Sequence, residues 1–495
     1  MISPDASNSP PAGPAGDIVF VPRIINPAKI RRVVIFAADE EIRRADAIIR
    51  SEMPWVGTEV MLDPAAVMAL RSDEPSAFIL DDIALNLIDA ETIRKNNREA
   101  VIILLSFVKL IQSSPPFVAE KEFPYTRKAD LIFAVNKSDC SPARITPSVV
   151  RSAEDHLNIA RRTEVRRFIV LIVDDEPSWS SQFLPILYSI IGQRAVVKLT
   201  RTYEEAVRFI FGVADEHEIG PDYRDHGLGE KVICLITDIF FPRKGKISSD
   251  SGTDLIHLVN KHYTRIPIVI ASKAKEALTL ADKGFILPKG DPGSLETLRS
   301  HIRDHTGMGD LVLFDADGKE LYRLKDIREI LDILMKASGR GPDAMRLRSV
   351  LEMYGEKDRF STWFYMHSLR ALGDKLRPQK LRGQEMIAAL TGALEQEILD
   401  MQRAPLIVDG AKIFSLRQLL AALKSTTPEN LEYLSDNDII SSWLDRTGFS
   451  DLAEELRPVH GTAENLRESL MKAVEGWIGR CEQRRTEQEE PPTEV

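Results

Sequence analysis

Five polar residues in the central part of the chain stand at the ends of short apolar runs, and their types could support phosphoryl transfer. Asp174 and Asp175 follow FIVLIV, Asp238 follows VICLIT, Ser272 closes IPIVIAS and Lys289 closes GFILPK. Transfer of a phosphoryl group to a carboxylate needs a rigid nucleophile, an anchored metal ion and neutralisation of the moving charge. Clustered acids can hold Mg²⁺, a lysine can face a phosphate as a compact charge, and a serine can hydrogen-bond a phosphoryl oxygen.

The surrounding pattern predicts a parallel sheet that would bring these residues together. From Phe168 onward, apolar runs alternate with helix-like segments such as SWSSQFLPILYSIIG, TYEEAVRFIFGVA and SGTDLIHLVNKHY. This alternation is typical of a doubly wound α/β fold, in which side chains at the carboxyl ends of neighbouring strands meet. We therefore predict such a domain over residues 167–306, with ADEHEIGPDYRDHGLGEK as an enlarged loop before the third strand.

This set of residues resembles the receiver domain of two-component response regulators. The hallmarks of that family are acids after the first strand, an aspartate after the third, a serine or threonine after the fourth and a lysine after the fifth. The resemblance implies that Asp238 accepts the phosphate, that Asp174, Asp175 and Asp238 bind Mg²⁺, that Ser272 is the switch hydroxyl and that Lys289 faces the phosphate.

Three features depart from the family pattern. The stretch before the third strand is long, Phe285 stands one position before the place where the family often has an aromatic residue, and Pro288 precedes the lysine instead of following it. These departures put the switch mechanism in question more than the phosphate acceptor. The main-chain carbonyl that would complete the metal site belongs to either Ile239 or Phe240, and the sequence leaves both open.

Residues 30–140 repeat the pattern less completely and predict a divergent receiver-like domain. Its apolar runs are VVIFAA, AFIL, AVIILL and ADLIFAV, and its degenerate site would contain Asp39, Asp82, Ser106 and Lys137. Ala38 stands where the second copy has an acid, which should weaken Mg²⁺ binding because less ligand charge remains. We expect this domain to serve contacts, with an active second site as the alternative and a solvated Asp81-Asp82 pair as a further one.

The rest of the chain is assigned to a linker helix, two repeats and two disordered tails. The linker helix covers 141–166, the repeats 307–400 and 401–480, and the tails 1–29 and 481–495. Each repeat would be a β-hairpin followed by helices, because DADGKELYRLKDI parallels VDGAKIFSLRQL and STWFYMHSLRALGDKLRP parallels SSWLDRTGFSDLAEELRP. The predicted fold class is thus α/β, with two flavodoxin-like doubly wound parallel-sheet domains followed by a mostly helical α+β tandem repeat.

Region 311–378 is also similar to a module that follows receivers in some bacterial phosphoenolpyruvate-synthase-like proteins. The chain supplies neither the nucleotide-binding nor the phosphohistidine domain of such an enzyme, so the resemblance does not imply that activity. We interpret the repeats as an interaction platform.

Composition narrows the function further. A formal net charge of -10 argues against sequence-independent nucleic-acid binding. The chain has no apolar run long enough to span a membrane and no signal-peptide pattern at its start. Its 3 cysteines are too widely spaced for a disulfide framework or a zinc site. We expect a cytoplasmic protein without membrane contact.

The leading hypothesis is a response regulator of a phosphorelay that uses Mg²⁺ and is not an enzyme, apart from self-phosphorylation and autodephosphorylation. Its partners would be a histidine kinase or phosphotransfer protein and an unknown downstream protein, and the sequence leaves a homodimer open. The main alternative is a phosphorylation-independent scaffold or adaptor that uses receiver-like folds as docking surfaces. A transcription regulator and an enzyme housed in the repeats are disfavoured, because no recognition helix and no convergent nucleophile and base are visible.

Overall fold

The computed structural model covers most of the chain. It describes residues 28–106, 128–135, 142–161, 168–192, 194–248, 250–273, 275–315, 317–377, 381–401, 404–457 and 463–489. Among the predicted site residues, Lys137 lies outside the described residues, as do positions 1–27 and 490–495 of the predicted tails.

Two compact units make up the described chain. The α/β unit contains Ile24–Lys325 and Arg346–Leu381, and the helical unit contains mainly Asp326–Met345 and Arg382–Val495. This division cuts through the predicted first repeat, so the domain boundaries drawn from the sequence stay predictions.

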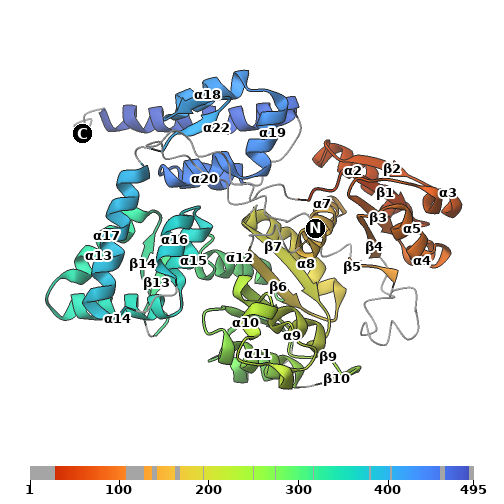
Figure 1. Ribbon diagram of the computed structural model, residues 1–495, viewed down its shortest axis with the longest axis horizontal. Helices are drawn as coiled ribbons and strands as arrows, with labels where there is room; N and C mark the ends of the chain where they lie inside the picture. Colours follow the sequence, from red (N-terminus) through yellow and green to blue (C-terminus); the bar gives the residue numbers. More distant parts are fainter. Residues whose placement is uncertain are drawn as a thin grey trace, which may run out of the picture. The chain divides into compact units, whose positions relative to one another are not determined.

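The first sheet of the α/β unit has five strands, and all of them except the edge strand β2 are mostly apolar and buried. Figure 1 shows this sheet in red and orange. All its strands pair in parallel, in the order β2-β1-β3-β4-β5. They are β1 (Arg32–Phe36), β2 (Gly57–Val60), β3 (Ser76–Leu80), β4 (Ala100–Ser106) and β5 (Leu131–Ala134). Strands of a parallel sheet are buried on both faces, which explains their continuous apolar runs.

Four helices of the first sheet begin at aspartate caps. The described helices are α1 (Glu40–Arg43), α2 (Ala45–Glu52), α3 (Pro64–Ala69), α4 (Asp82–Leu87), α5 (Ala90–Asn96) and α7 (Pro142–Ala160). Asp39, Asp63, Asp81 and Asp89 each accept a hydrogen bond from a backbone N–H in the first turn of the helix that follows. Such caps satisfy donors that the helix itself leaves unpaired.

The second sheet repeats the topology of the first, in the order β12-β11-β8-β6-β7. Its parallel strands are β6 (Phe168–Val173), β7 (Ala195–Thr200), β8 (Val232–Thr237), β11 (Ile268–Ser272) and β12 (Phe285–Pro288). Its main helices are α8 (Pro177–Ile191), α9 (Tyr203–Phe211), α11 (Ser251–His262) and α12 (Ser294–His305). A small hairpin, β9 (Phe241–Arg243) and β10 (Lys246–Ser248), follows β8, while α10 (Tyr223–His226) and short 3₁₀ turns occupy the enlarged loop before it.

The two faces of the second sheet bury separate cores. Val170 and Ile172 of β6 pack on the face covered by α8 and α12, and this core is continuous with that of the first sheet. Leu171 and Val173 pack on the opposite face with α9 and α11. The alternation follows from the period of two in a β-strand.

Helix α7, predicted as a linker, is part of the packed structure. The carboxylate of Asp155, fully buried, accepts from the Tyr188 hydroxyl at 2.9 Å and from the Val197 backbone N–H at 2.7 Å, both in the second α/β fold. Asn158 bonds the backbone of Ala28 through both its amide oxygen and its amide nitrogen, at 2.8 and 3.1 Å. Because one helix serves both sheets, the two α/β folds share a core.

The C-terminal segments contain two copies of one element order. The first copy is β13 (Leu311–Phe314), β14 (Glu320–Leu324), α13 (Ile327–Ser338), α14 (Pro342–Glu356), α15 (Arg359–Met366), α16 (Arg370–Leu376) and α17 (Gly383–Met401). The second is β15 (Leu406–Val408), β16 (Ala411–Ile413), α18 (Leu416–Ser425), α19 (Pro428–Asp436), α20 (Ile439–Arg446), α21 (Ser450–Leu456) and α22 (Ala463–Glu489). Helix α22 continues to Glu489, so most of the predicted tail 481–495 is helical instead.

The predicted fold class is confirmed: two flavodoxin-like five-stranded parallel sheets precede a region rich in helices. Within the described ranges, no helix is long and apolar enough to cross a bilayer.

Candidate phosphoacceptor site

The structure brings together the five residues singled out in the second α/β fold. Asp238 is the first residue after β8, and its backbone N–H bonds the Val173 carbonyl at 3.0 Å, which extends the β6–β8 ladder by one step. Ser272 is the last residue of β11, and Lys289 follows β12 directly. All three therefore lie at the carboxyl edge of the sheet, as expected for neighbouring parallel strands.

Three donors converge on the Asp238 carboxylate. Its Oδ1 accepts from the Ser272 hydroxyl at 2.7 Å and from the Ile239 backbone N–H at 2.6 Å. Its Oδ2 accepts from Lys289 Nζ at 2.5 Å. The side chain keeps 15% of its exposure, whereas that of Lys289 keeps 1%, so the carboxylate is held in place yet open on one side.

Lys289 also bonds the second acid of the site. Its Nζ lies 2.6 Å from Asp174 Oδ2, and both side chains are almost completely buried. Burial alone would lower the pKa of Lys289, but the carboxylates of Asp174 and Asp238 outweigh it and raise that pKa. The ammonium group is therefore a fixed positive charge between two carboxylates.

The two acids after β6 both have raised pKa values. Burial raises the pKa of Asp174 to about 6, against the opposing effect of Lys289. Burial and the neighbouring Asp174 and Glu176 carboxylates raise the pKa of Asp175 to about 7. Clustered carboxyl groups with raised pKa values are common at functional sites, since the protein structure keeps them together at a cost.

These residues fit a magnesium ion. The described residues contain no tight group of three or more His, Cys, Asp or Glu side chains, so the site is not a preformed cage. Mg²⁺ does not need one, because it usually keeps several waters and binds through one or two carboxylates. The donor set is hard oxygen, and the raised pKa values of Asp174 and Asp175 mark the excess charge that a divalent cation would compensate.

Two neighbours of the site were missed in the sequence. The Trp179 ring, in the first turn of α8, lies 4.5 Å from Lys273 Nζ and 5.7 Å from Lys289 Nζ. Gly252 begins α11 so close to the Asp238–Ile239 backbone that an added Cβ would come within 2.3 Å of Ile239 Cα. A glycine is required here because any side chain would collide with the backbone after β8. The letters SGTD alone indicate only a glycine near the start of a helix.

The first sheet does not reproduce the site. Its strand pairing shows which of its residues occupy the positions of the site residues in the second sheet, and these differ from the predicted ones. Phe36 pairs with Leu80 as Val173 pairs with Thr237. Ala37 and Ala38 therefore occupy the places of Asp174 and Asp175, and Asp39 takes the place of the helix-capping Glu176.

The strand pairing also identifies the equivalent residues after the third strand and at the end of the fourth. Asp81, not Asp82, is the first residue after β3, and its side chain bonds the backbone N–H groups of Asp39 and Ala84 at 2.8 and 2.7 Å. Ser106 does match Ser272, because each ends its strand opposite the last residue of the fifth strand.

The position of Lys289 is taken by Val135 in the first sheet. Val135 bonds the Ser106 carbonyl through its N–H at 2.8 Å, as Lys289 bonds the Ser272 carbonyl at 3.2 Å. Lys137, the residue expected there, is two positions further on and outside the described residues. The first sheet thus lacks both strand-β1 acids and the lysine.

At the other end of the second sheet, the segment with helices α15 and α16 is bonded to the turn after α12 and to the turn before β8. Trp363 Nε1 donates to the Gly309 carbonyl at 3.0 Å, and the Trp363 and His367 rings stack at 3.9 Å. Arg377 forms an ion pair at 3.3 Å with Glu230, which lies in the 3₁₀ turn just before β8. The first copy of the repeat therefore contacts the sheet edge opposite Asp238.

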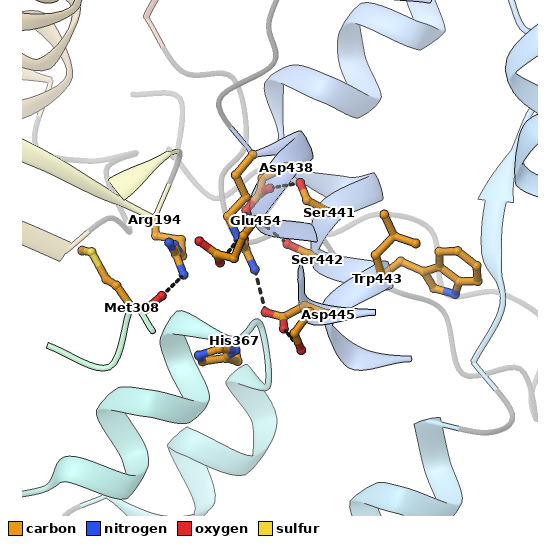
Figure 2. Close-up of polar contacts among 12 residues, drawn as sticks. Arg194, Met308, His367, Asp438, Ser441, Ser442, Trp443, Asp445 and Glu454 are labelled. Atoms are coloured by element: carbon orange, nitrogen blue, oxygen red, sulfur yellow. Dashed lines mark hydrogen bonds and ion pairs between the residues drawn. The ribbon is translucent and has the colours of Figure 1, made fainter. Parts of the chain in front are cut away.

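A buried ion network marks the second copy of the repeat. Figure 2 shows the carboxylates of Asp438, Asp445 and Glu454 pointing toward one another. The Arg457 guanidinium joins them at 2.7, 2.6 and 2.9 Å. Burial would lower the pKa of Arg457, but these three carboxylates raise it well above its ordinary value.

Comparisons with known proteins give little beyond this geometry. No family model matches the chain, and no curated protein matches it. Among solved structures, a putative two-component system response regulator/GGDEF domain protein is 14% identical, with a TM-score of 0.24, over 55% of this chain and 97% of its own. NtrX from Brucella abortus, in complex with ATP, is 12% identical with a TM-score of 0.20, over 90% of this chain and 99% of its own. At such TM-scores the likeness does not bear on function, which has to be argued from the site.

Proposed function

We propose that this protein is a response regulator that accepts a phosphoryl group on Asp238. The observation that carries the proposal is the convergence of Ser272, Lys289 and the Ile239 N–H on one partly exposed carboxylate. An ordinary solvated acid at a strand end has no need of a buried lysine and a buried hydroxyl. A carboxylate nucleophile does, because rigid positioning and charge neutralisation are what phosphoryl transfer requires.

The proposed reaction is an in-line displacement at phosphorus. A carboxylate oxygen of Asp238 forms the new P–O bond while the bond from phosphorus to the donor breaks, and the donor leaves with the electron pair. The donor would be the phosphohistidine of a histidine kinase or phosphotransfer protein, or a small acyl phosphate. Lys289 stays charged throughout and faces the transferred oxygens, and Ser272 can rotate its hydroxyl from Asp238 to a phosphoryl oxygen.

Mg²⁺, when bound, would neutralise charge on the phosphoryl oxygens and help to align them. Asp174, Asp175 and Asp238 would hold it. The Ile239 carbonyl already accepts from the Gly252 N–H at 3.0 Å, which favours the Phe240 carbonyl as the remaining protein ligand.

The first α/β fold would take no part in this chemistry. Alanine stands at 37 and 38, where the second fold has Asp174 and Asp175, and valine stands at 135, where it has Lys289. We propose that this fold is a docking module, and that the scaffold function first considered for the whole protein applies to this part. The repeats would pass the signal to a downstream protein.

The test is phosphorylation of the full-length protein by acetyl phosphate and Mg²⁺, followed by intact mass. We expect one added phosphate in the wild type and in Asp81→Ala, and none in Asp238→Ala. Asp81→Ala is the matched control, since it removes the acid at the same place in the first sheet. Phosphate retained by Asp238→Ala, or no phosphate on the wild type from either acetyl phosphate or a cognate kinase, would refute the proposal.

A further inference from the structure

A cavity of about 330 Å³ is lined by residues of both α/β folds and reaches Asp174 of the candidate phosphoacceptor site. One wall is apolar and includes Leu131 of β5 and Phe209 of α9. The other wall comes from β7, the residue after it and the last turn of α9, and it contains Lys198, Arg201 and Arg208. The volume falls at the lower end of the range for small-molecule sites, which also combine apolar walls with a few polar groups.

The acids of the lining are already engaged with other groups. Asp130 accepts from Arg94 at 3.0 Å and from the Ile102 backbone N–H at 2.8 Å. Asp174 accepts from Lys289, and Glu205 accepts from the Arg201 backbone N–H at 2.7 Å. Each of these three carboxylates therefore already has a hydrogen-bond partner, and Glu205 also acts on Lys198 electrostatically.

Lys198 is the most unusual of those cations. It is half-buried in the middle of an edge strand, and it forms no hydrogen bond or ion pair with any residue that the structure describes. Its nearest aromatic contact is the Phe209 ring, 5.9 Å from Nζ. Burial lowers the pKa of Lys198, and the nearby Glu205 carboxylate opposes this effect without reversing it.

Arg208 adds a second charge at the mouth of the cavity. Its side chain is exposed and has no ion pair among the described residues. Removing a cation such as Lys198 from water without a partner is destabilising. The cavity beside Lys198 has room for an anion that would compensate this charge. The cost disappears if a ligand supplies the negative charge.

We propose that this cavity binds a small organic anion carrying phosphate or carboxylate groups, with Lys198 as the inner contact and Arg208 at the entrance. The apolar wall would receive the body of the ligand. The lining of the cavity includes Asp174 but not Asp238, Ser272 or Lys289, and the proposal can be tested without the proposed function. Because the wall residues come from both α/β folds, a bound ligand would tie the two folds together.

The experiment is calorimetric titration of the full-length protein in EDTA with pyrophosphate and, in a second arm, with citrate. The two arms distinguish a phosphate ligand from a carboxylate one. We expect saturable one-site binding in at least one arm, weakened by about tenfold or more in Lys198→Met, because a charge-assisted hydrogen bond contributes this much. Lys198→Arg should bind within a few-fold of wild type. Lys246→Met, an exposed lysine on β10, is the matched control and should bind like wild type.

Three outcomes would overturn the proposal. One is the absence of saturable binding in both arms at millimolar concentrations. Another is equal binding by Lys198→Met and wild type. The third is loss of binding in Asp238→Asn, which would place the anion at the phosphate acceptor instead. An unchanged unfolding midpoint in Lys198→Met would show that the variant is folded and that weaker binding has another cause.

Discussion

Replacing Asp175 by asparagine should make the protein more stable at alkaline pH in the absence of divalent cations. Asp175 is 5% exposed and stands next to Asp174 and Glu176. Burial and these carboxylates raise its pKa from 3.8 to about 7. The amide keeps the shape of the side chain and removes the charge that the folded protein tolerates poorly.

The sign and size of the effect follow from proton binding. Between pH 5 and pH 8 the unfolded carboxyl is charged throughout, whereas the folded one keeps its proton up to about pH 7. The folded state binds more protons, so the free energy of unfolding falls as pH rises through this window. About two pH units at ~1.4 kcal/mol each give a loss of roughly 3 kcal/mol from Asp175. Asp174, with a pKa of about 6, adds roughly 1.4 kcal/mol.

The assay is urea unfolding of the full-length protein in EDTA at pH 5 and pH 8, followed by tryptophan fluorescence. Between the two pH values Asp175→Asn should lose roughly 3 kcal/mol less than the wild type. The comparison with the wild type is needed because the buried His301 and His305, whose pKa values are lowered to about 3 and about 4, make an opposing contribution that both proteins share. Asp291→Asn, the same change at an exposed position, should behave like wild type. Mg²⁺ should reduce the loss in the wild type, because it favours the charged carboxylates. An equal loss in Asp175→Asn and wild type would refute the argument.

Three further changes test the remaining structure. Lys289→Met leaves two buried carboxylates without their cation. The free energy of unfolding at pH 8 should therefore fall by about 3–5 kcal/mol, and phosphorylation by acetyl phosphate should slow about a hundredfold. A phosphorylation rate near that of wild type would contradict the role given to the lysine. Arg457→Met should cost about 3–5 kcal/mol in denaturant unfolding, and Arg457→Lys should recover little of it, because an ammonium cannot reach three carboxylates at once. Trp363→Ala removes a fully buried ring that also bonds the Gly309 carbonyl, so it should cost about 3–5 kcal/mol, and a cost below about 1 kcal/mol would show that α15 is not fastened to the α/β unit in this way.

The sequence was a good guide to the second sheet because its strand ends are marked by chemistry. A buried strand is a continuous apolar run, and in FIVLIVDDEP and VICLITDIFF the first charged residue coincides with the end of the strand. Parallel strands end at a common edge, so residue types at those points predict which side chains meet. The contributions of Trp179 and the Ile239 N–H could not be predicted, since both depend on how a helix and a turn are placed over that edge.

The first sheet shows where this reasoning fails. Its first apolar run, VVIFAA, is continued by two alanines, and alanine does not reveal whether the strand has ended. The strand stops at Phe36, so Asp39 is one position too late to replace an acid of the site. An offset of one residue in a strand moves a side chain to the other face, and only the pairing with β3 fixes it.

The two repeats have matching backbone conformations, but equivalent side chains in the two copies have different partners. Asp358 and Asp438 both adopt a left-handed backbone before a helix, and Trp363 and Trp443 are both buried behind them. Arg457 finds Asp445 within its own copy, but the matching position in the first copy is Tyr365, whose ring packs 5.5 Å from Phe168 at the start of β6. Arg377, the counterpart of Arg457, keeps an ion pair with Asp358 of its own copy at 3.9 Å and also bonds Glu230 of the second α/β fold at 3.3 Å. One exchange of an acid for an aromatic residue thus removes an internal partner and supplies a contact to the second sheet, which is how a duplicated module can keep its fold and change what it binds.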